Sequence, residues 1–221
     1  MDTDYWCERW VRSETGFHQN EINPHLRQFW PALNLTPGSR VFVPLCGKSQ
    51  DMLWLRAQGH EVIGVEISPL AVEAFFAENN LQASATKHGN ASIYQTEGLR
   101  LYCGDFFRVT AEDVAGVSAV FDRASLIALP PSMRSAYAAH MQNILAPGVK
   151  TLLVTFDYPQ HEMQGPPFSV QEPEVRALYE KTSEVRLLHS ADILNKETRF
   201  RDKGITQLQE NIFLVTYNKQ G

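Results

Sequence analysis

The sequence predicts an α/β fold with a mostly parallel central sheet, an antiparallel strand near the C-terminus and helices on both faces. From residue 40 onward, short apolar runs rich in β-branched residues alternate with segments of helical periodicity. Glycine, proline and serine stand at the borders between these segments. Strands that alternate with helices form parallel sheets covered on both faces, so this alternation indicates the fold class.

The first two strand–helix units are the clearest part of the pattern. Ser68 is a typical N-cap residue and Pro69 suits the first position of a helix, so a helix is expected directly after the second strand. The expected elements are a strand at 41–45, a helix around 52–55 that is closed by Gly59, a strand at 62–67 and a helix at 71–79.

The second half of the chain adds a hairpin, further strand–helix steps and a closing antiparallel pair. Residues 157–168 contain three prolines and a glycine just after a strand end, which predicts a lid over a site. The remaining expected elements are hairpin strands at 92–94 and 99–103, a strand at 117–122, a helix at 132–145, a strand at 151–156, a helix at 173–181 and paired strands at 185–189 and 211–217.

Composition favours one domain, 1–221, that binds neither nucleic acid nor membranes. The chain has 221 residues, 43% hydrophobic, and its net charge of -5 comes without a block of Lys or Arg. No apolar run approaches the ~18 residues of a membrane span, and the N-terminus does not resemble a signal peptide, so a cytoplasmic protein is expected. The three cysteines lack metal-ligand spacing, which predicts no metal site.

The turn after the first strand limits the kind of cofactor. Gly47-Lys48-Ser49 is not a P-loop, because Phe42 stands where that motif needs a glycine. A dinucleotide fold needs several glycines here, and Asp51 would be unfavourable beside phosphates. Glu66 ends the second strand ~20 residues later, where an acid binds ribose hydroxyls. A ribose without a pyrophosphate predicts S-adenosylmethionine, although a solvated loop acid at Glu66 remains an alternative.

Several motifs resemble those of the thiopurine S-methyltransferase family, and they recur in the family's order across almost the whole chain. The turn and the Gly-Pro-Pro-Phe segment are more specific than the glycines common to methyltransferases. The motifs are Trp6-x-x-x-Trp10, Phe17-His18-Gln19, Val43-Pro44-Leu45-Cys46-Gly47-Lys48-Ser49, Asp122-Arg123 and Gly165-Pro166-Pro167-Phe168.

The resemblance implies a Rossmann-like class I methyltransferase with an aromatic N-terminal cap, residues 1–35, over the cofactor site. An aromatic face attracts cations, so Trp10 is expected over the sulfonium. Phe106 would pack on adenine, although Asp105-Phe106 departs from the smaller pair expected in animal members. The cofactor-binding positions carried over from the family are Trp10, Leu45, Glu66, Phe106 and Arg123.

Two of these positions keep alternatives. Leu45 is equally consistent with simple core packing. Arg123 follows a buried strand and should meet Asp122, a ligand carboxylate or an anionic acceptor, which makes it a candidate for acceptor positioning. His18 is interpreted as structural, because nothing near it in the sequence completes a triad.

The implied reaction is S-methylation of aromatic and heterocyclic thiols such as 6-mercaptopurine. Such thiols are largely anionic near neutral pH, so positioning and water exclusion matter more than a general base. Phe168 is the candidate lid contact.

The chain begins close to Trp6, as in bacterial members of the family, which are associated with methylation of selenium and tellurium compounds and with resistance to them. The resemblance also implies a monomer. The alternatives are a halide or thiocyanate methyltransferase and a non-catalytic S-adenosyl ligand-binding module.

Overall fold

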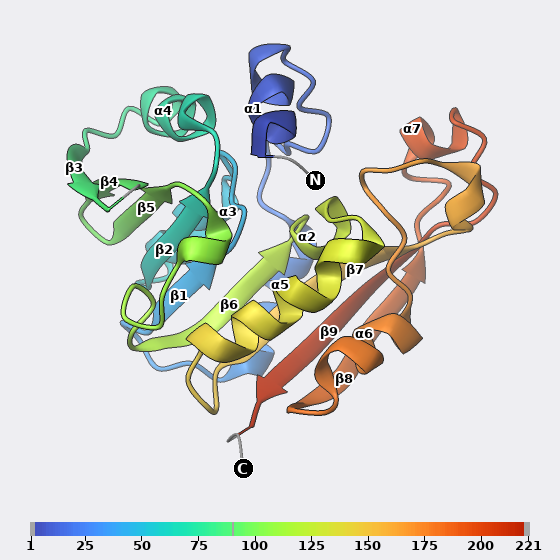
Figure 1. Cartoon of the computed structure of the whole chain (residues 1–221). Helices are drawn as coiled ribbons and strands as arrows, with labels where there is room; N and C mark the ends of the chain where they lie inside the picture. The colour runs from blue at the N-terminus through green and yellow to red at the C-terminus, as the bar shows by residue number, and fades with distance from the viewer. Residues whose placement is uncertain (1–2, 90, 219–221) are drawn as a thin grey trace. The chain divides into compact units, whose positions relative to one another are not determined.

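The computed structural model describes residues 3–89 and 91–218, and Figure 1 shows their secondary structure. The chain divides into two compact units, and the boundary between Phe121 and Asp122 falls inside strand β6. The first unit contains α1 (Thr3–Val11), α2 (Pro24–Phe29), η1 (Trp30–Leu33), β1 (Arg40–Val43), α3 (Asp51–Ala57), β2 (Glu61–Glu66), α4 (Pro69–Glu78), β3 (Ser84–His88), β4 (Ala91–Thr96), β5 (Leu99–Cys103), η2 (Phe106–Arg108) and most of β6 (Val117–Arg123). The second contains η3 (Leu126–Ala128), α5 (Pro131–Ile144), β7 (Lys150–Asp157), η4 (Gln160–Glu162), α6 (Glu172–Tyr179), β8 (Ser183–Asp192), α7 (Thr198–Arg201) and β9 (Gln209–Tyr217).

Parallel strands form the centre of the first unit. Strand β2 lies between β5 and β1, and β1 pairs on its other side with β6, all in parallel. The predicted mixed α/β fold is therefore confirmed. The first strand ends two residues earlier than predicted, because Leu45 adopts a left-handed backbone conformation with φ 44° that a strand cannot contain.

The predicted hairpin is present as β4 and β5, which pair in register from Ser92 opposite Cys103 to Thr96 opposite Leu99. An additional strand, β3, pairs with β4 in the antiparallel sense and was not predicted. Every residue of β3 is exposed, so it lacks the buried apolar alternation by which a strand is recognised in a sequence.

The second unit ends in the antiparallel pair that the sequence predicted. Strand β9 pairs with β7 on one side and with β8 on the other, both antiparallel. Helix α6 packs on β8, where Arg176 donates to the carbonyl of Val185, and Gln142 of α5 donates to the carbonyl of Leu178. Figure 1 shows α6 in front of β8 and β9.

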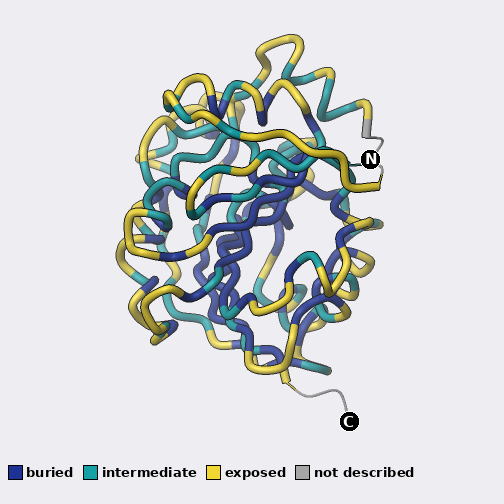
Figure 2. The backbone as a smooth tube through the Cα atoms, turned by 90° about the vertical axis from the view of Figure 1, so that its left-hand side faces the viewer, coloured by how far each residue is buried: buried dark blue, intermediate teal, exposed yellow. Residues whose placement is uncertain are grey.

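Burial is concentrated along the strands, as the dark blue stretches of Figure 2 show. In the first unit, Val41 and Phe42 of β1 are completely buried, and in the second, Ile212 and Phe213 of β9 are too. Neighbouring residues are buried on both faces of these strands, which is typical of strands that have helices on both sides.

A buried histidine predicts one pH effect on stability. Trp30 donates a hydrogen bond to Nε2 of His60 at 3.1 Å, so this nitrogen must be unprotonated in the folded chain. Burial lowers the pKa of His60 from its ordinary value of 6.5. We expect the folded state to lose stability as the pH falls below about 6.5, because unfolding then allows His60 to take up a proton. Measured by urea unfolding, the free energy of unfolding of a His60→Gln variant should fall less than that of wild type between pH 7.5 and about 5.5. An equal fall in both proteins would contradict this prediction.

Candidate functional site

The carboxyl ends of β1 and β2 are tied together by the turn between β1 and α3. The backbone N–H of Cys46 donates to the carbonyl of Val65 at 2.9 Å. Leu45 and Gly47 both have positive φ angles, 44° and 52°. A left-handed conformation at a leucine costs of order 1–3 kcal/mol, and strain of this kind concentrates at ligand-binding sites. The turn is thus a well-defined cradle, and contact of Leu45 with a cofactor stays a prediction.

Glu66 is the charged centre of this cradle. Its Oε2 accepts a hydrogen bond from the N–H of Gly47 at 2.9 Å, and its Oε1 accepts one from the N–H of Ser68 at 2.8 Å. The side chain is only 6% exposed, so the alternative of a solvated loop acid is excluded. Burial raises the pKa of Glu66, while the backbone hydrogen bonds act in the opposite direction and favour the carboxylate.

The Glu66 carboxylate retains capacity for a ligand. A carboxylate has about four lone-pair positions; Gly47 and Ser68 use one on each oxygen, and the backbone of Ile67 also interacts with the carboxylate. The capacity that is left suits hydroxyl donors such as those of a ribose. Since the carboxylate is already fixed by Gly47 and Ser68, it needs no rearrangement to accept them. The residues present therefore fit the ribose of S-adenosylmethionine.

Trp10 of helix α1 lies directly over the turn. A Cβ built on Gly47 would lie 3.3 Å from Cζ2 of Trp10, so the indole contacts the backbone of the cradle. Trp6 and Trp10 lie four residues apart on α1, and both rings meet Phe17 edge to face, at 5.5 and 5.6 Å between centroids. The two tryptophans therefore lie on the same face of α1. Trp10 is only partly buried, which leaves ring surface beside the turn.

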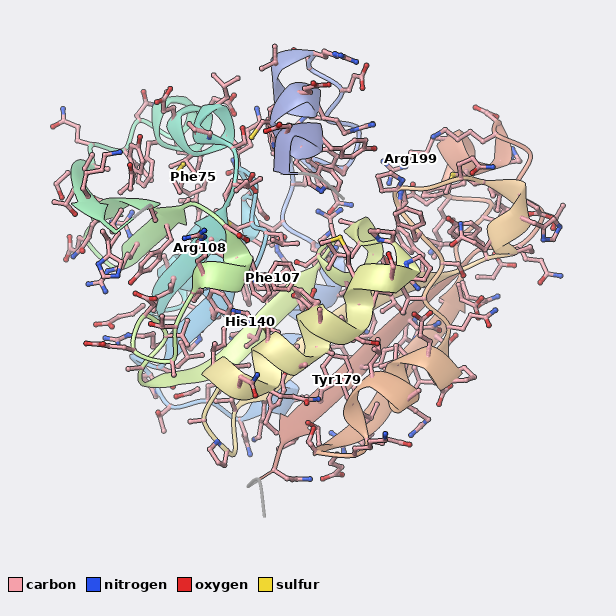
Figure 3. The ribbon with its side chains drawn as sticks, in the orientation of Figure 1. Phe75, Phe107, Arg108, His140, Tyr179 and Arg199 are labelled. Carbon is pink, nitrogen blue, oxygen red and sulfur yellow. The ribbon has the colours of Figure 1, made fainter. Side chains whose placement is uncertain are left out.

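Phe106 occupies a different environment from the one expected for an exposed adenine platform. It is 3% exposed and stacks on Phe42 of β1, with 6.5 Å between centroids. Its neighbour Phe107, labelled on η2 in Figure 3, is 37% exposed. The N–H of Gly104 donates to the carbonyl of Glu66 at 2.8 Å, which joins this segment to the cradle. Contact of Phe106 with adenine stays a prediction.

Asp51, which the sequence only marked as unfavourable beside phosphates, has a clear structural role. It is the first residue of α3 and is 2% exposed. Its carboxylate accepts from the N–H of Asn23 at 2.7 Å and from the hydroxyl of Ser49 at 2.8 Å. Asp51 therefore links the turn to the segment before α2, a link between residues 28 apart that no local sequence pattern indicates.

Arg123 lies at the end of β6, in the second unit, and is partly buried. The preceding residue, Asp122, is 1% exposed, and its carboxylate accepts a hydrogen bond from the hydroxyl of Tyr137 at 2.8 Å. Ala124 follows with a φ of 64°, so the chain turns sharply after Arg123. Arg123 is therefore the last residue before the chain turns away from β6. Contact of Arg123 with a cofactor or an acceptor stays a prediction.

The proposed lid segment is held within the second unit by several hydrogen bonds. The N–H of Phe168 donates to the carbonyl of Ile127 at 2.7 Å, and the hydroxyl of Tyr158 donates to the carbonyl of Pro167 at 2.6 Å. The N–H of Ser169 donates to Gln160 at 2.9 Å. Phe168 is partly buried, and the guanidinium of Arg134 lies over its ring. The sequence pattern indicated the segment but not Arg134.

The three cysteines are free thiols, and Cys46 and Cys103 are buried. Over residues 3–89 and 91–218, no group of three or more His, Cys, Asp or Glu side chains is placed to hold a metal ion. The helices of the same residues include none that is long and apolar enough to cross a membrane.

Solved structures with the same fold include methyltransferases. The 1,6-didemethyltoxoflavin-N1-methyltransferase of Burkholderia thailandensis, solved with S-adenosylhomocysteine, is 14% identical with a TM-score of 0.65, and the match covers 98% of this chain and 87% of that one. An S-adenosylmethionine-dependent methyltransferase from Anabaena variabilis also has a TM-score of 0.65, at 10% identity, with 98% and 95% covered. At this identity the likeness supports the fold.

Sequence comparison identifies the family. The family model described as thiopurine S-methyltransferase matches residues 1–218. The thiopurine S-methyltransferase of Nitrosospira multiformis is 54% identical over 215 residues, which cover 97% of this chain and 98% of that protein. That of Bordetella petrii is 48% identical over 213 residues, covering 96% and 97%. The resemblance seen in the motifs is confirmed, and the chain belongs to the thiopurine S-methyltransferase family.

Proposed function

We propose that this protein transfers the methyl group of S-adenosylmethionine to the sulfur of aromatic and heterocyclic thiols such as 6-mercaptopurine. Membership of the family supports the donor and the reaction class. The observation that carries the proposal is the Glu66 carboxylate, which is buried at the end of β2 and already fixed by the N–H groups of Gly47 and Ser68. A carboxylate in this position can accept hydrogen bonds from a ribose. The turn beside it has no group that would hold a pyrophosphate.

Each cofactor-binding residue has a proposed part. Glu66 accepts hydrogen bonds from the ribose, and the ring of Trp10 covers the positive charge, an attraction of ~0.5 to 2 kcal/mol. The strained turn at Leu45 shapes the cradle, and Phe106 packs beside the adenine. Arg123 binds the cofactor carboxylate or positions an anionic acceptor.

The side chains position the reactants and exclude water. When bound, S-adenosylmethionine supplies an electrophilic methyl group on a sulfonium. An aromatic thiol is already largely anionic at neutral pH, so the reaction needs no general base from the chain. The charges of thiolate and sulfonium cancel as the methyl group moves, so a dry aromatic pocket favours the transfer. Phe168, on the segment that follows β7, is the proposed lid contact.

The broader setting of the enzyme is also a proposal. Residues 1–221 form a single methyltransferase domain, and residues 1–35 cap the cofactor. The resemblance of the motifs to bacterial members of the family motivates a further proposed role in methylating selenium and tellurium compounds, with resistance to these metalloids as the benefit. The protein works in the cytoplasm as a monomer, and its acceptor is a small molecule rather than a nucleic acid or a membrane.

Methyl transfer to a defined series of acceptors tests the proposal. We expect labelled methyl transfer from S-adenosylmethionine to 6-mercaptopurine, with turnover at least about 10-fold above that with iodide or thiocyanate, because an aromatic acceptor gains contact area in the pocket. Selenite in a parallel reaction tests the metalloid role. Competition by S-adenosylhomocysteine controls for transfer that does not use the cofactor site.

Three results would change the assignment. Turnover with iodide or thiocyanate in place of the thiol would assign a different methyltransferase activity. Tight binding of S-adenosylhomocysteine by calorimetry, without turnover on any acceptor, would support a non-catalytic binding module. Transfer to 6-mercaptopurine without transfer to selenite would keep the thiol activity and reject the metalloid role.

A further inference from the structure

Arg134 is a buried cation in an unfavourable place. It is 1% exposed and belongs to the first turn of α5, where the positive end of the helix dipole repels cations. Its Nη1 donates to both carboxylate oxygens of Glu174 at 2.7 Å, and its Nε donates to the carbonyl of Leu129 at 3.0 Å. Its Nη2 is buried without a hydrogen-bond acceptor in the described part of the chain.

The ring of Phe168 faces this guanidinium. The distance from Cζ of Arg134 to the ring centroid is 5.8 Å, within the range of a cation–π contact. An apolar side chain would fill the same space without burying an incompletely bonded cation. Arg134 is therefore better explained by its directional contacts, because it joins Leu129, Glu174 and Phe168, which come from three separate segments.

Phe168 is also restrained from other sides. Its N–H donates to the carbonyl of Ile127 at 2.7 Å, so its backbone is fixed. A Cβ built on Gly165 would lie less than 3.0 Å from the ring of Phe168, so the ring occupies the space that any larger residue at 165 would need. The aromatic ring thus has one defined position, with Gly165 on one side and the Arg134 guanidinium over its face.

We propose that Arg134 is a positioning residue for the methyl acceptor. It holds the Phe168 ring in the place where that ring contacts an aromatic thiol, and so sets the affinity for ring-bearing acceptors without touching the cofactor. This inference rests on the proposed thiol methylation and on the lid role of Phe168. It adds that acceptor selectivity is controlled by a residue that lies beneath the lid segment and does not contact the acceptor.

Three variants test the proposal. Arg134→Met removes the cation but keeps an unbranched apolar chain. Gly165→Ala places a methyl group in the space of the ring and strains the backbone, whose φ at Gly165 is 74°, but it removes none of the groups that hydrogen-bond to Arg134. Arg176→Met is the matched control, because Arg176 also lies in a helix and pairs with Glu172 and Glu180, but is partly exposed and contacts β8 rather than the lid segment. A cation–π contact corresponds to about 2- to 30-fold in affinity. We expect both test variants to raise the KM for 6-mercaptopurine by at least about 5-fold, with the control near wild type.

The split between kinetic parameters separates positioning from general damage. The KM for S-adenosylmethionine and the Kd of S-adenosylhomocysteine should stay within about 2-fold of wild type in all three variants. Arg134→Lys keeps the charge but lacks the planar guanidinium, so its affinity for 6-mercaptopurine should lie between those of Arg134→Met and wild type.

Hydrogen exchange provides a readout that does not depend on activity. Peptides covering Phe168 should exchange faster in Arg134→Met and Gly165→Ala than in wild type or Arg176→Met, because the Phe168 amide loses a fixed position. Unchanged exchange and unchanged acceptor KM in both test variants would overturn the proposal while leaving thiol methylation intact. Absence of thiol turnover in the wild type would instead contradict the proposed function. If Arg134→Met does not fold, the test rests on Gly165→Ala alone. A KM for 6-mercaptopurine equal to that of wild type in this variant would then overturn the proposal.

Discussion

Replacement of Glu66 by glutamine is expected to weaken S-adenosylmethionine binding by about 100-fold. Hydrogen bonds to a charged group contribute ~1.5–3 kcal/mol each, and the change weakens both bonds to the ribose. Glutamine also places an NH2 group, which only donates, opposite one of the two backbone N–H donors, Gly47 or Ser68. Part of the loss therefore comes from the cradle itself. Calorimetric titration with S-adenosylmethionine measures the effect.

Glu61 provides the matched control on the same strand. It is the first residue of β2, it is exposed, and it pairs with Arg40 at 2.8 Å. A Glu61→Gln variant loses the same charge and should keep wild-type cofactor affinity, because exposed ion pairs contribute little. If Glu66→Gln bound the cofactor as tightly as Glu61→Gln does, Glu66 would not be the ribose ligand and the site would have to be placed elsewhere.

The position of Glu66 was predictable because it depends on repeating local patterns. The apolar run before it, the Ser68-Pro69 helix start after it and the interval from the first turn all stand in the printed sequence. The carboxyl ends of parallel strands lie at one edge of a sheet, so two such strands bring the turn and the acid together. The hydrogen bond from Gly47 to Glu66 realises this expectation.

The partners of the lid segment were not predictable in this way. Arg134 and Phe168 are 34 residues apart, and nothing in the helix containing Arg134 marks it as different from a surface arginine. Its burial follows from tertiary packing, which no short-range pattern encodes. Phe106 illustrates the same limit: the motif places it next to the strand end, but stacking on Phe42 of β1 decides which of the two adjacent phenylalanines is buried.

Replacement of Asp122 by asparagine is expected to change the pH dependence of stability in the direction opposite to that of an acid whose pKa is lowered on folding. Burial raises the pKa of Asp122 from 3.8 to about 6, although the hydrogen bond from Tyr137 acts in the other direction. The folded state thus holds this proton more tightly than the unfolded state. As the pH rises from about 4 to about 6, the unfolded chain releases the proton first, and the folded state loses stability.

The expected size is large for a single side chain. A rise in pKa from 3.8 to about 6 corresponds to ~3 kcal/mol at pH values above both. Asparagine has no charge to bury and can still accept the hydrogen bond from Tyr137. The free energy of unfolding of Asp122→Asn, minus that of wild type, should therefore increase by up to ~3 kcal/mol between about pH 4 and pH 7. Urea unfolding at several pH values measures this difference.

Asp113 supplies a control whose pKa is shifted in the opposite direction. Burial acts to raise its pKa, but hydrogen bonds from Thr110 outweigh it and lower the pKa below 3.8. Asp113 is therefore ionised in both states above about pH 4.5, so its own ionisation adds no pH dependence from there to pH 7. Because Asp113 pairs with His88 at 3.1 Å, the control carries Asp113→Asn in a His88→Gln background, where the difference from His88→Gln alone should stay constant over this range. A constant difference for Asp122→Asn as well would mean that Asp122 is ionised in the folded chain throughout. The buried Asp122–Tyr137 bond would then hold a carboxylate rather than a carboxylic acid at the end of β6, next to Arg123.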